Sequence, residues 1–266
     1  MPAEQAYGLE DLLRVMERLR DPEHGCPWDL KQDFRTIAPS TLEEAYELVE
    51  AIEHEDFPHV AEELGDLLFQ VIFYTQMGRE RGLFDLHQVI DTLVDKLLRR
   101  HPHVFAGGNI EGIVDADASV AEVKQSWEAI KREERAARAQ HGALDDVPVA
   151  LPAISRAQKL QKRAATVGFD WSDVDGVMDK LHEEIAELQE ADSAAAREEE
   201  LGDLIFTCIN LGRHLGVDSE AALRRASSKF EARFNTMEAR ITQAGQRVEE
   251  VDSETLNKAW EAAKKG

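Results

Sequence analysis

Apolar residues return every three or four positions along most of this chain. The pattern is clear in YELVEAIE (46–53) and in LGDLLFQVIFYTQM (64–77). This is the period of an α-helix that buries one of its faces. Neither half of the chain shows the sustained alternation of apolar and polar residues that is typical of strands. We therefore predict an all-α protein.

Glycine, proline and aspartate interrupt the helical pattern in clusters, and such clusters favour turns and loops. The cluster at 141–153 falls near the middle of the 266 residues. It is the predicted linker between an N-terminal helical domain, 1–140, and a C-terminal helical domain, 150–266. Shorter breaks between helices are expected at 20–29, 55–60 and 101–119.

The two halves repeat a series of motifs in the same order. EELGDLLF (62–69) returns as EELGDLIF (199–206), and each follows a segment of the form EExxELxEA, at 43–51 and at 183–191. An internal duplication is the simplest explanation, and it predicts tandem helical bundles. Each half then carries Lys-x-x-x-Arg and Trp-x-x-x-Lys at the same spacing: Lys96, Arg100, Trp127 and Lys131, then Lys229, Arg233, Trp260 and Lys264.

The acidic motifs place pairs of carboxylates on helix faces. Residues three apart on a helix project from one side, so each motif offers two carboxylates together. If the two helices of one half pack antiparallel, the pairs face each other and make a four-carboxylate cluster. The clusters are Glu44, Glu47, Glu63 and Asp66 in the first half, and Glu184, Glu187, Glu200 and Asp203 in the second.

Four converging carboxylates repel one another unless a cation neutralises them. Oxygen ligands without histidine or cysteine point to Mg²⁺, with Mn²⁺ as a substitute. Any lone ExxE on a helix is more often a solvated face, because the chain has 53 acidic residues. A solvated face has no reason to keep the same spacing and the same following motifs twice, so the repeat favours the metal-site interpretation.

Composition narrows the classes of protein further. The formal net charge of −22 repels a phosphate backbone, which disfavours nucleic-acid binding. No segment approaches the ~20 apolar residues that a membrane helix needs, so we expect no membrane contact. The chain has two cysteines and no apolar run near its start, and we expect a cytoplasmic protein without a disulfide framework.

Together the motifs resemble the MazG family of all-α nucleoside triphosphate pyrophosphohydrolases. The resemblance extends to RLRDPEHGCPWD, TIAPSTLEEAYE, RRHPHVFA and LDDVPVALPAISRAQKLQKRAATVGFDW. It implies Mg²⁺-dependent cleavage of a nucleoside triphosphate between the α and β phosphates, giving a nucleoside monophosphate and pyrophosphate. It further implies that the second half carries the hydrolysis, with Glu184, Glu187, Glu200 and Asp203 as the catalytic and metal-binding residues.

The resemblance also implies contacts to the nucleotide. Lys180, one turn before Glu184, and the pair Lys229 and Arg233 resemble the triphosphate contacts of the family. The first half has Ser40 at the position of Lys180, which favours the second half as the active one. Trp260 with Lys264 is expected to stack on the base. The alternatives are ordinary surface ion pairs for the cations and packing of a terminal helix for the tryptophan.

Each half offers few helices for its apolar faces, such as the one with Leu67, Leu68 and Val71. Small helical units often complete their core against another copy, so we predict a homodimer. The glycine of each ELGD motif is expected to let a neighbouring helix approach closely.

Two other functions stay open at this point. A catalytically silent module that binds Mg²⁺ and dimerises would carry the same carboxylates. A ferritin-like di-metal oxidoreductase also builds carboxylate clusters in helical bundles, but it needs Glu-x-x-His pairs, and none of the nine histidines follows a glutamate at that spacing. There is no GxxxxGK[ST] and no GxGxxG motif, which argues against other nucleotide-binding folds.

Overall fold

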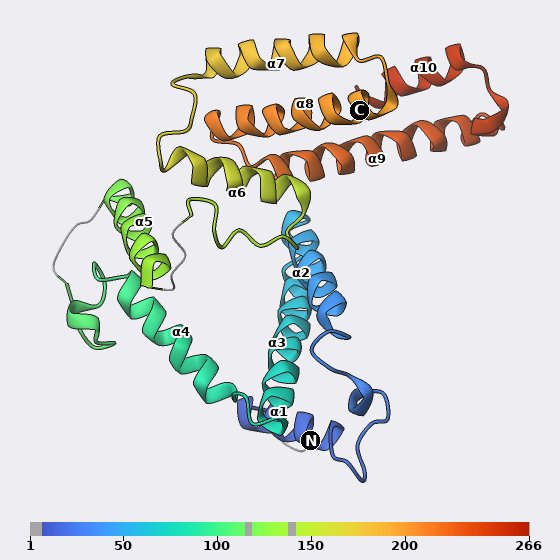
Figure 1. Ribbon diagram of the computed structural model, residues 1–266. Coiled ribbons are helices and arrows are strands. Elements are labelled where there is room, and N and C mark those ends of the chain that lie inside the picture. The colour runs from blue at the N-terminus through green and yellow to red at the C-terminus, as the bar shows by residue number, and fades with distance from the viewer. Residues whose placement is uncertain (1–6, 115–118, 138–141, 266) are drawn as a thin grey trace. The chain divides into compact units, whose positions relative to one another are not determined.

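The computed structural model describes residues 7–114, 119–137 and 142–265, and these residues form helices joined by turns and loops, with no strand among them. The prediction of an all-α chain is confirmed (Figure 1). Among the described residues, no helix is both long enough and apolar enough to cross a membrane. The chain divides into two compact units, Met1–Arg132 and Glu133–Gly266. By its contacts, the predicted linker at 141–153 belongs to the second unit, and 138–141 lies outside the described residues.

The first unit is organised around one long antiparallel helix pair. Helices α2 and α3 pack along each other, and α1 packs against α3 (Figure 1). In chain order the elements are α1 (Leu9–Leu19), the 3-10 turn η1 (Asp29–Lys31), α2 (Ala38–Glu53), α3 (Phe57–Glu80), α4 (Leu86–Arg100), the 3-10 turn η2 (Ala106–Gly108) and α5 (Val120–Ala137), which crosses the division at Arg132.

The core of the first unit lies toward the C-terminal end of α3. Ile72, Phe73 and Met77 are fully buried there against Met16 of α1 and Ile37. The acidic residues near the start of α3 therefore lie at the end of the helix pair that is opposite the core.

The second unit repeats the antiparallel pair. Helices α7 and α8 pack along each other, and α6 packs against α8 and α9 (Figure 1). The Gln161 amide nitrogen on α6 donates to the Phe206 carbonyl on α8 at 2.7 Å. The elements are α6 (Ala153–Ala165), α7 (Val174–Glu190), α8 (Ala194–His214), α9 (Ser219–Gln243), the 3-10 turn η3 (Val248–Glu250) and α10 (Ser253–Ala263).

The two pairs differ in the length of their first helix. Both connections have three residues, and α3 and α8 begin at the same distance before the ELGD motif. Helix α2, however, continues six residues beyond Glu47, whereas α7 continues three beyond Glu187. Glu47 and Glu63 are 16 residues apart, against 13 for Glu187 and Glu200, and this longer spacing is therefore almost one extra turn of α2. Pro58 lies in the first turn of α3, where its missing N–H has no helical partner to lose, so it does not distort the pair.

Candidate metal centre

Three carboxylates of the second unit converge between α7 and α8. Glu184, Glu187 and Glu200 each bring one oxygen within 4.8 Å of the others. Glu184 is buried, Glu187 is exposed and Glu200 is half-buried. Antiparallel packing of the two helices makes this possible, because the EExxE turn of α7 then faces the start of α8. Asp203, the fourth predicted ligand, is exposed and lies outside this group.

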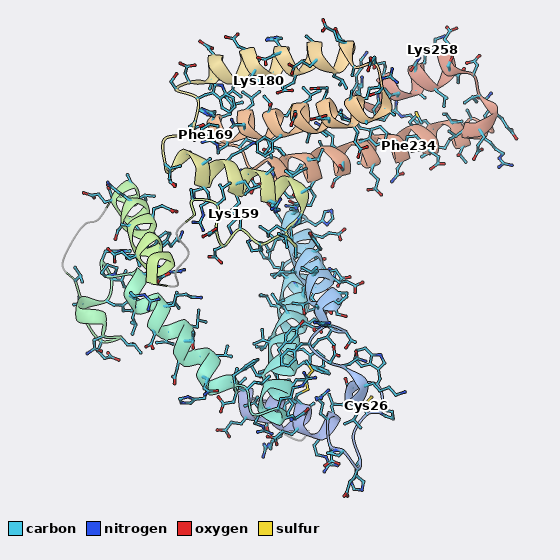
Figure 2. All side chains as sticks on the ribbon, in the orientation of Figure 1. Cys26, Lys159, Phe169, Lys180, Phe234 and Lys258 are labelled. Carbon is cyan, nitrogen blue, oxygen red and sulfur yellow. The ribbon has the colours of Figure 1, made fainter. Side chains whose placement is uncertain are left out.

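Lys180, which Figure 2 labels on α7, lies beside these carboxylates. Its Nζ is 2.9 Å from Glu184 Oε1 and 3.8 Å from Glu187 Oε2. It also donates to Glu183 Oε1 at 2.6 Å. The hydrogen bonds to Glu183 and Glu184 raise the pKa of Lys180, so the ammonium stays charged. One predicted substrate contact is thus a direct neighbour of the acidic group.

The charge of the group is only partly neutralised by this lysine. Desolvation, followed by the charges of Glu187 and Glu184, raises the pKa of Glu200. Glu184 Oε2 is buried and has no hydrogen-bond partner among the residues that the structure describes. A buried carboxylate oxygen without a partner is costly, and a cation bound by the group would satisfy it. Three carboxylates with one open buried oxygen fit a hard divalent cation such as Mg²⁺.

The first unit has the equivalent group between α2 and α3. Glu44, Glu47 and Glu63 bring one oxygen each within 4.8 Å of one another. Asp66 is exposed and outside the group. Desolvation, followed by the charges of Asp66 and Glu47, raises the pKa of Glu44. The two groups therefore share their geometry and their electrostatic repulsion.

The first group has a neighbour that the sequence analysis did not single out. His59 Nε2 lies 2.7 Å from Glu63 Oε1. Glu63 is only 7% exposed, and its other oxygen, Oε2, is buried without a partner. The available signal was the spacing: His59 precedes Glu63 by one helical turn, whereas Ala196 precedes Glu200 at the matched position. Ser40, the counterpart of Lys180, lies in the first turn of α2.

The predicted base and phosphate contacts lie on α9 and α10. The ring of Trp260 is 5.3 Å from that of Phe230, and Lys264 Nζ is 5.9 Å from the Trp260 ring. Lys264 also pairs with Glu261 at 2.6 Å. Trp260 is half-buried, so it packs against α9 while leaving part of its ring open. Lys229 is exposed and Arg233 half-buried on α9. Helix α10 runs back from the far end of α9, toward the α7–α8 connection in Figure 1.

Comparison with known proteins identifies the family. The profile of the MazG nucleotide pyrophosphohydrolase domain matches residues 32–105. The nucleoside triphosphate pyrophosphohydrolase of Escherichia coli (strain K12) is 52% identical over 262 residues, which cover 97% of this chain and 97% of that protein. The chain belongs to the MazG family. The nucleoside triphosphate pyrophosphohydrolase/pyrophosphatase MazG of Thermotoga maritima is 45% identical over 258 residues, covering 97% and 96% of the two chains.

A solved structure is also similar. The crystal structure of a mazG-related protein from Thermotoga maritima covers 47% of this chain and 99% of that chain, with 27% identity and a TM-score of 0.39. The profile match at 32–105 falls on the first acidic group, whereas the group with the lysine neighbour lies outside it.

The glycines of the two ELGD motifs do not serve helix packing within their own units. Apart from the backbone of its own helix, a Cβ atom placed on Gly65 or Gly202 would meet no described atom within 4 Å. The expectation of a close helix approach is therefore wrong for contacts inside each unit. The helix faces that carry these glycines also expose Leu64, Leu68, Leu201 and Ile205.

Proposed function

We propose that this chain is a Mg²⁺-dependent nucleoside triphosphate pyrophosphohydrolase that acts on the nucleotide pool. It cleaves nucleoside and deoxynucleoside triphosphates between the α and β phosphates, with little selection for the base. The observation that carries the proposal is the group of Glu184, Glu187 and Glu200 with Lys180 beside it. The full-length similarity to proteins named nucleoside triphosphate pyrophosphohydrolases supports the same activity.

The residues of the second unit divide the work between metal and substrate. When bound, Mg²⁺ supplies charge neutralisation at the triphosphate and activation of the attacking water. Glu184, Glu187 and Glu200 would hold the ion, and Asp203 adds negative charge beside Glu200. Lys180, whose Nζ contacts Glu184, would supply a positive charge for the phosphates once an ion neutralises the carboxylates.

The remaining contacts come from α9 and α10. Lys229 and Arg233 lie four residues apart on α9 and thus on one face, which suits two neighbouring phosphate groups. The open part of the Trp260 ring, with Lys264 beside it, offers a stacking surface for any base. Stacking is tolerant of base identity, which supports a broad substrate range.

The hydrolysis is assigned to the second unit. Lys180 lies beside its carboxylate group and offers a positive charge to the triphosphate. The first unit has Ser40 at the equivalent position. We expect Glu187→Ala or Asp203→Ala to lower turnover by about 10² to 10³ or more, because each removes negative charge that holds the ion in the transition state. Glu47→Ala and Asp66→Ala are the matched controls and should keep most of the activity.

The assay measures monophosphate and pyrophosphate from a panel of nucleoside and deoxynucleoside triphosphates with Mg²⁺, and circular dichroism checks that each variant is folded. Loss of activity in the Glu47 and Asp66 variants, with activity kept in Asp203→Ala, would place the reaction in the first unit. Release of inorganic phosphate and nucleoside diphosphate would refute the cleavage position. A folded protein that binds Mg²⁺ but forms no pyrophosphate from any triphosphate would be the silent module instead.

We propose further that the chain acts as a homodimer. Helix α8 exposes Leu201, Ile205 and Phe206, and α9 exposes Phe230 and Phe234. Apolar residues gathered on helix faces in this way are typical of surfaces that another chain covers. The open space at Gly202 lets a partner helix come close at the same face.

A further inference from the structure

The first carboxylate group differs from the second in the side chain that partners its buried glutamate. In the first unit this partner is an imidazole, His59, and in the second it is an ammonium, Lys180. An ammonium cannot bind a metal ion, whereas a neutral imidazole nitrogen is a common ligand. The difference therefore concerns which ions the two groups can hold, beyond the hydrolysis proposed above.

The position of His59 is fixed by the start of α3. The Asp56 side chain caps the helix and accepts the His59 backbone N–H at 3.3 Å. His59 then lies one turn before Glu63 on the same helix face, and its Nε2 reaches Glu63 Oε1 at 2.7 Å. Two ligands four residues apart on one helix face are a recurrent arrangement in metal sites.

Glu63 itself lacks a partner for half of its carboxylate. Its side chain is 9% exposed, and the buried Oε2 makes no hydrogen bond. One of its oxygens lies within 4.8 Å of oxygens of Glu44 and Glu47. Burying an unpaired carboxylate oxygen among two other carboxylates is unfavourable unless a cation is bound there.

A pocket lies beside this group, next to the last turn of α2. The pocket has a volume of about 330 Å³, begins at Glu47 and Glu63 and extends to the end of α2. Apart from Ala51, the residues that line it have side chains with oxygen or nitrogen donor atoms. They are Glu47, Glu50, His54, Asp56, His59 and Glu63.

We propose that the first unit holds a mixed nitrogen and oxygen site for a divalent transition-metal ion. Glu44, Glu47 and Glu63 form it, and His59, which contacts Glu63 but lies outside the 4.8 Å group, turns in as the nitrogen ligand. Imidazole favours ions such as Co²⁺, Ni²⁺ and Zn²⁺ over Mg²⁺, which prefers oxygen ligands alone. The second unit has Ala196 in place of His59, so its group offers oxygen ligands only.

The test uses the full chain with Glu184→Gln and Glu187→Gln, so that the second group is silenced and hydrolysis plays no part in the readout. Calorimetric titration with Co²⁺ and with Mg²⁺ compares this protein with the same protein carrying His59→Ala. We expect His59→Ala to weaken Co²⁺ binding by about 10- to 100-fold and to leave Mg²⁺ binding unchanged, since lost or misplaced histidine contacts have effects of this size. His87→Ala is the matched control, because His87 is an exposed histidine of the same unit that pairs with Asp91.

Electron spin-echo spectroscopy of bound Mn²⁺ gives a second, independent readout. Coupling to a histidine ¹⁴N nucleus is expected in the parent protein and absent in His59→Ala. In the reciprocal chain, with Glu44→Gln and Glu47→Gln, adding Ala196→His should introduce that coupling. Equal Co²⁺ affinity with and without His59, or no ¹⁴N coupling in the folded parent, would overturn the proposal. Failure here leaves the hydrolysis of the second unit untouched, because pyrophosphate release is measured in the unmodified chain.

Discussion

At the scale of single residues, the two acidic groups have equivalent glutamates that differ in burial and in partner. In the first unit the buried member with a nitrogen partner is Glu63, on the second helix of the pair. In the second unit it is Glu184, on the first helix. In each unit the glutamate facing it on the other helix of the pair has a raised pKa. This is Glu44 in the first unit and Glu200 in the second. The two units thus bury glutamates at different positions of the repeat, one beside an imidazole and the other beside an ammonium.

The raised pKa of Glu200 predicts a pH-dependent loss of stability in metal-free protein. A carboxyl group whose pKa is higher in the folded state stabilises the fold below its ordinary pKa of 4.5, and this contribution is lost as pH rises through the raised value. We expect the unfolding temperature in EDTA to fall over that range, and to fall less in Glu200→Gln, which has no charge to form. Added Mg²⁺ should restore the unmodified protein more than the variant. Identical pH profiles for the two proteins in EDTA would contradict this prediction.

At the scale of elements, the two ends of the α2–α3 pair differ in what they carry. In the first unit, the acidic group occupies the end near the α2–α3 connection, and the core occupies the other end of α3. Arg20, whose side chain is 8% exposed, ties α1 to α3 through Glu80 at 2.6 Å and lies over the ring of Phe73. Placing the packing at one end leaves the other end free for binding.

Arg20→Ala should destabilise the first unit without altering the metal group. It removes charge-assisted hydrogen bonds to the Glu80 side chain and to the backbone carbonyl of Asp29. We expect a loss of about 2 to 3 kcal/mol in the free energy of unfolding, since Glu80 keeps partial access to water. Urea denaturation measures this loss. Arg14→Ala is the control, because Arg14 is 73% exposed in its pair with Asp11 and should change stability by less than about 1 kcal/mol.

At the scale of the whole molecule, both units leave apolar residues of their central helices uncovered. Leu64 and Leu68 are exposed on α3, and Leu201, Ile205 and Phe206 on α8. The equivalent positions in both repeats therefore lack a covering partner within their own unit.

Sedimentation should give twice the chain mass of 29.9 kDa at micromolar concentration. A charge at a buried dimer contact would lack a partner, so Ile205→Glu should shift the protein toward monomer. Val149→Glu is the control, because Val149 is 82% exposed in a connection between helices. A mass near that of one chain for the unmodified protein would refute the dimer.

Much of the fold and part of the site followed from local spacing. The helical period of 46–53 and 64–77 predicted the helices, because one-sided burial of a helix imposes that period. Glu184 and Glu187 were predicted to share a face for the same reason. Glu200 and Asp203 share a face of α8 by the same rule, but their distances to Glu184 and Glu187 depend on how α8 is rotated against α7.

The sequence alone determined the helices, the family and the acidic repeats, since these depend on spacing along one chain. Only the tertiary structure decided which glutamate is buried in each unit, which three carboxylates come within 4.8 Å of one another, and that His59 lies against Glu63. The extra turn of α2 could not be predicted from the sequence, since a longer spacing between the two acidic motifs fits a longer loop equally well. Burial and the choice of partner depend on the packing of one helix against another, and that packing is not encoded in the periodicity of either helix.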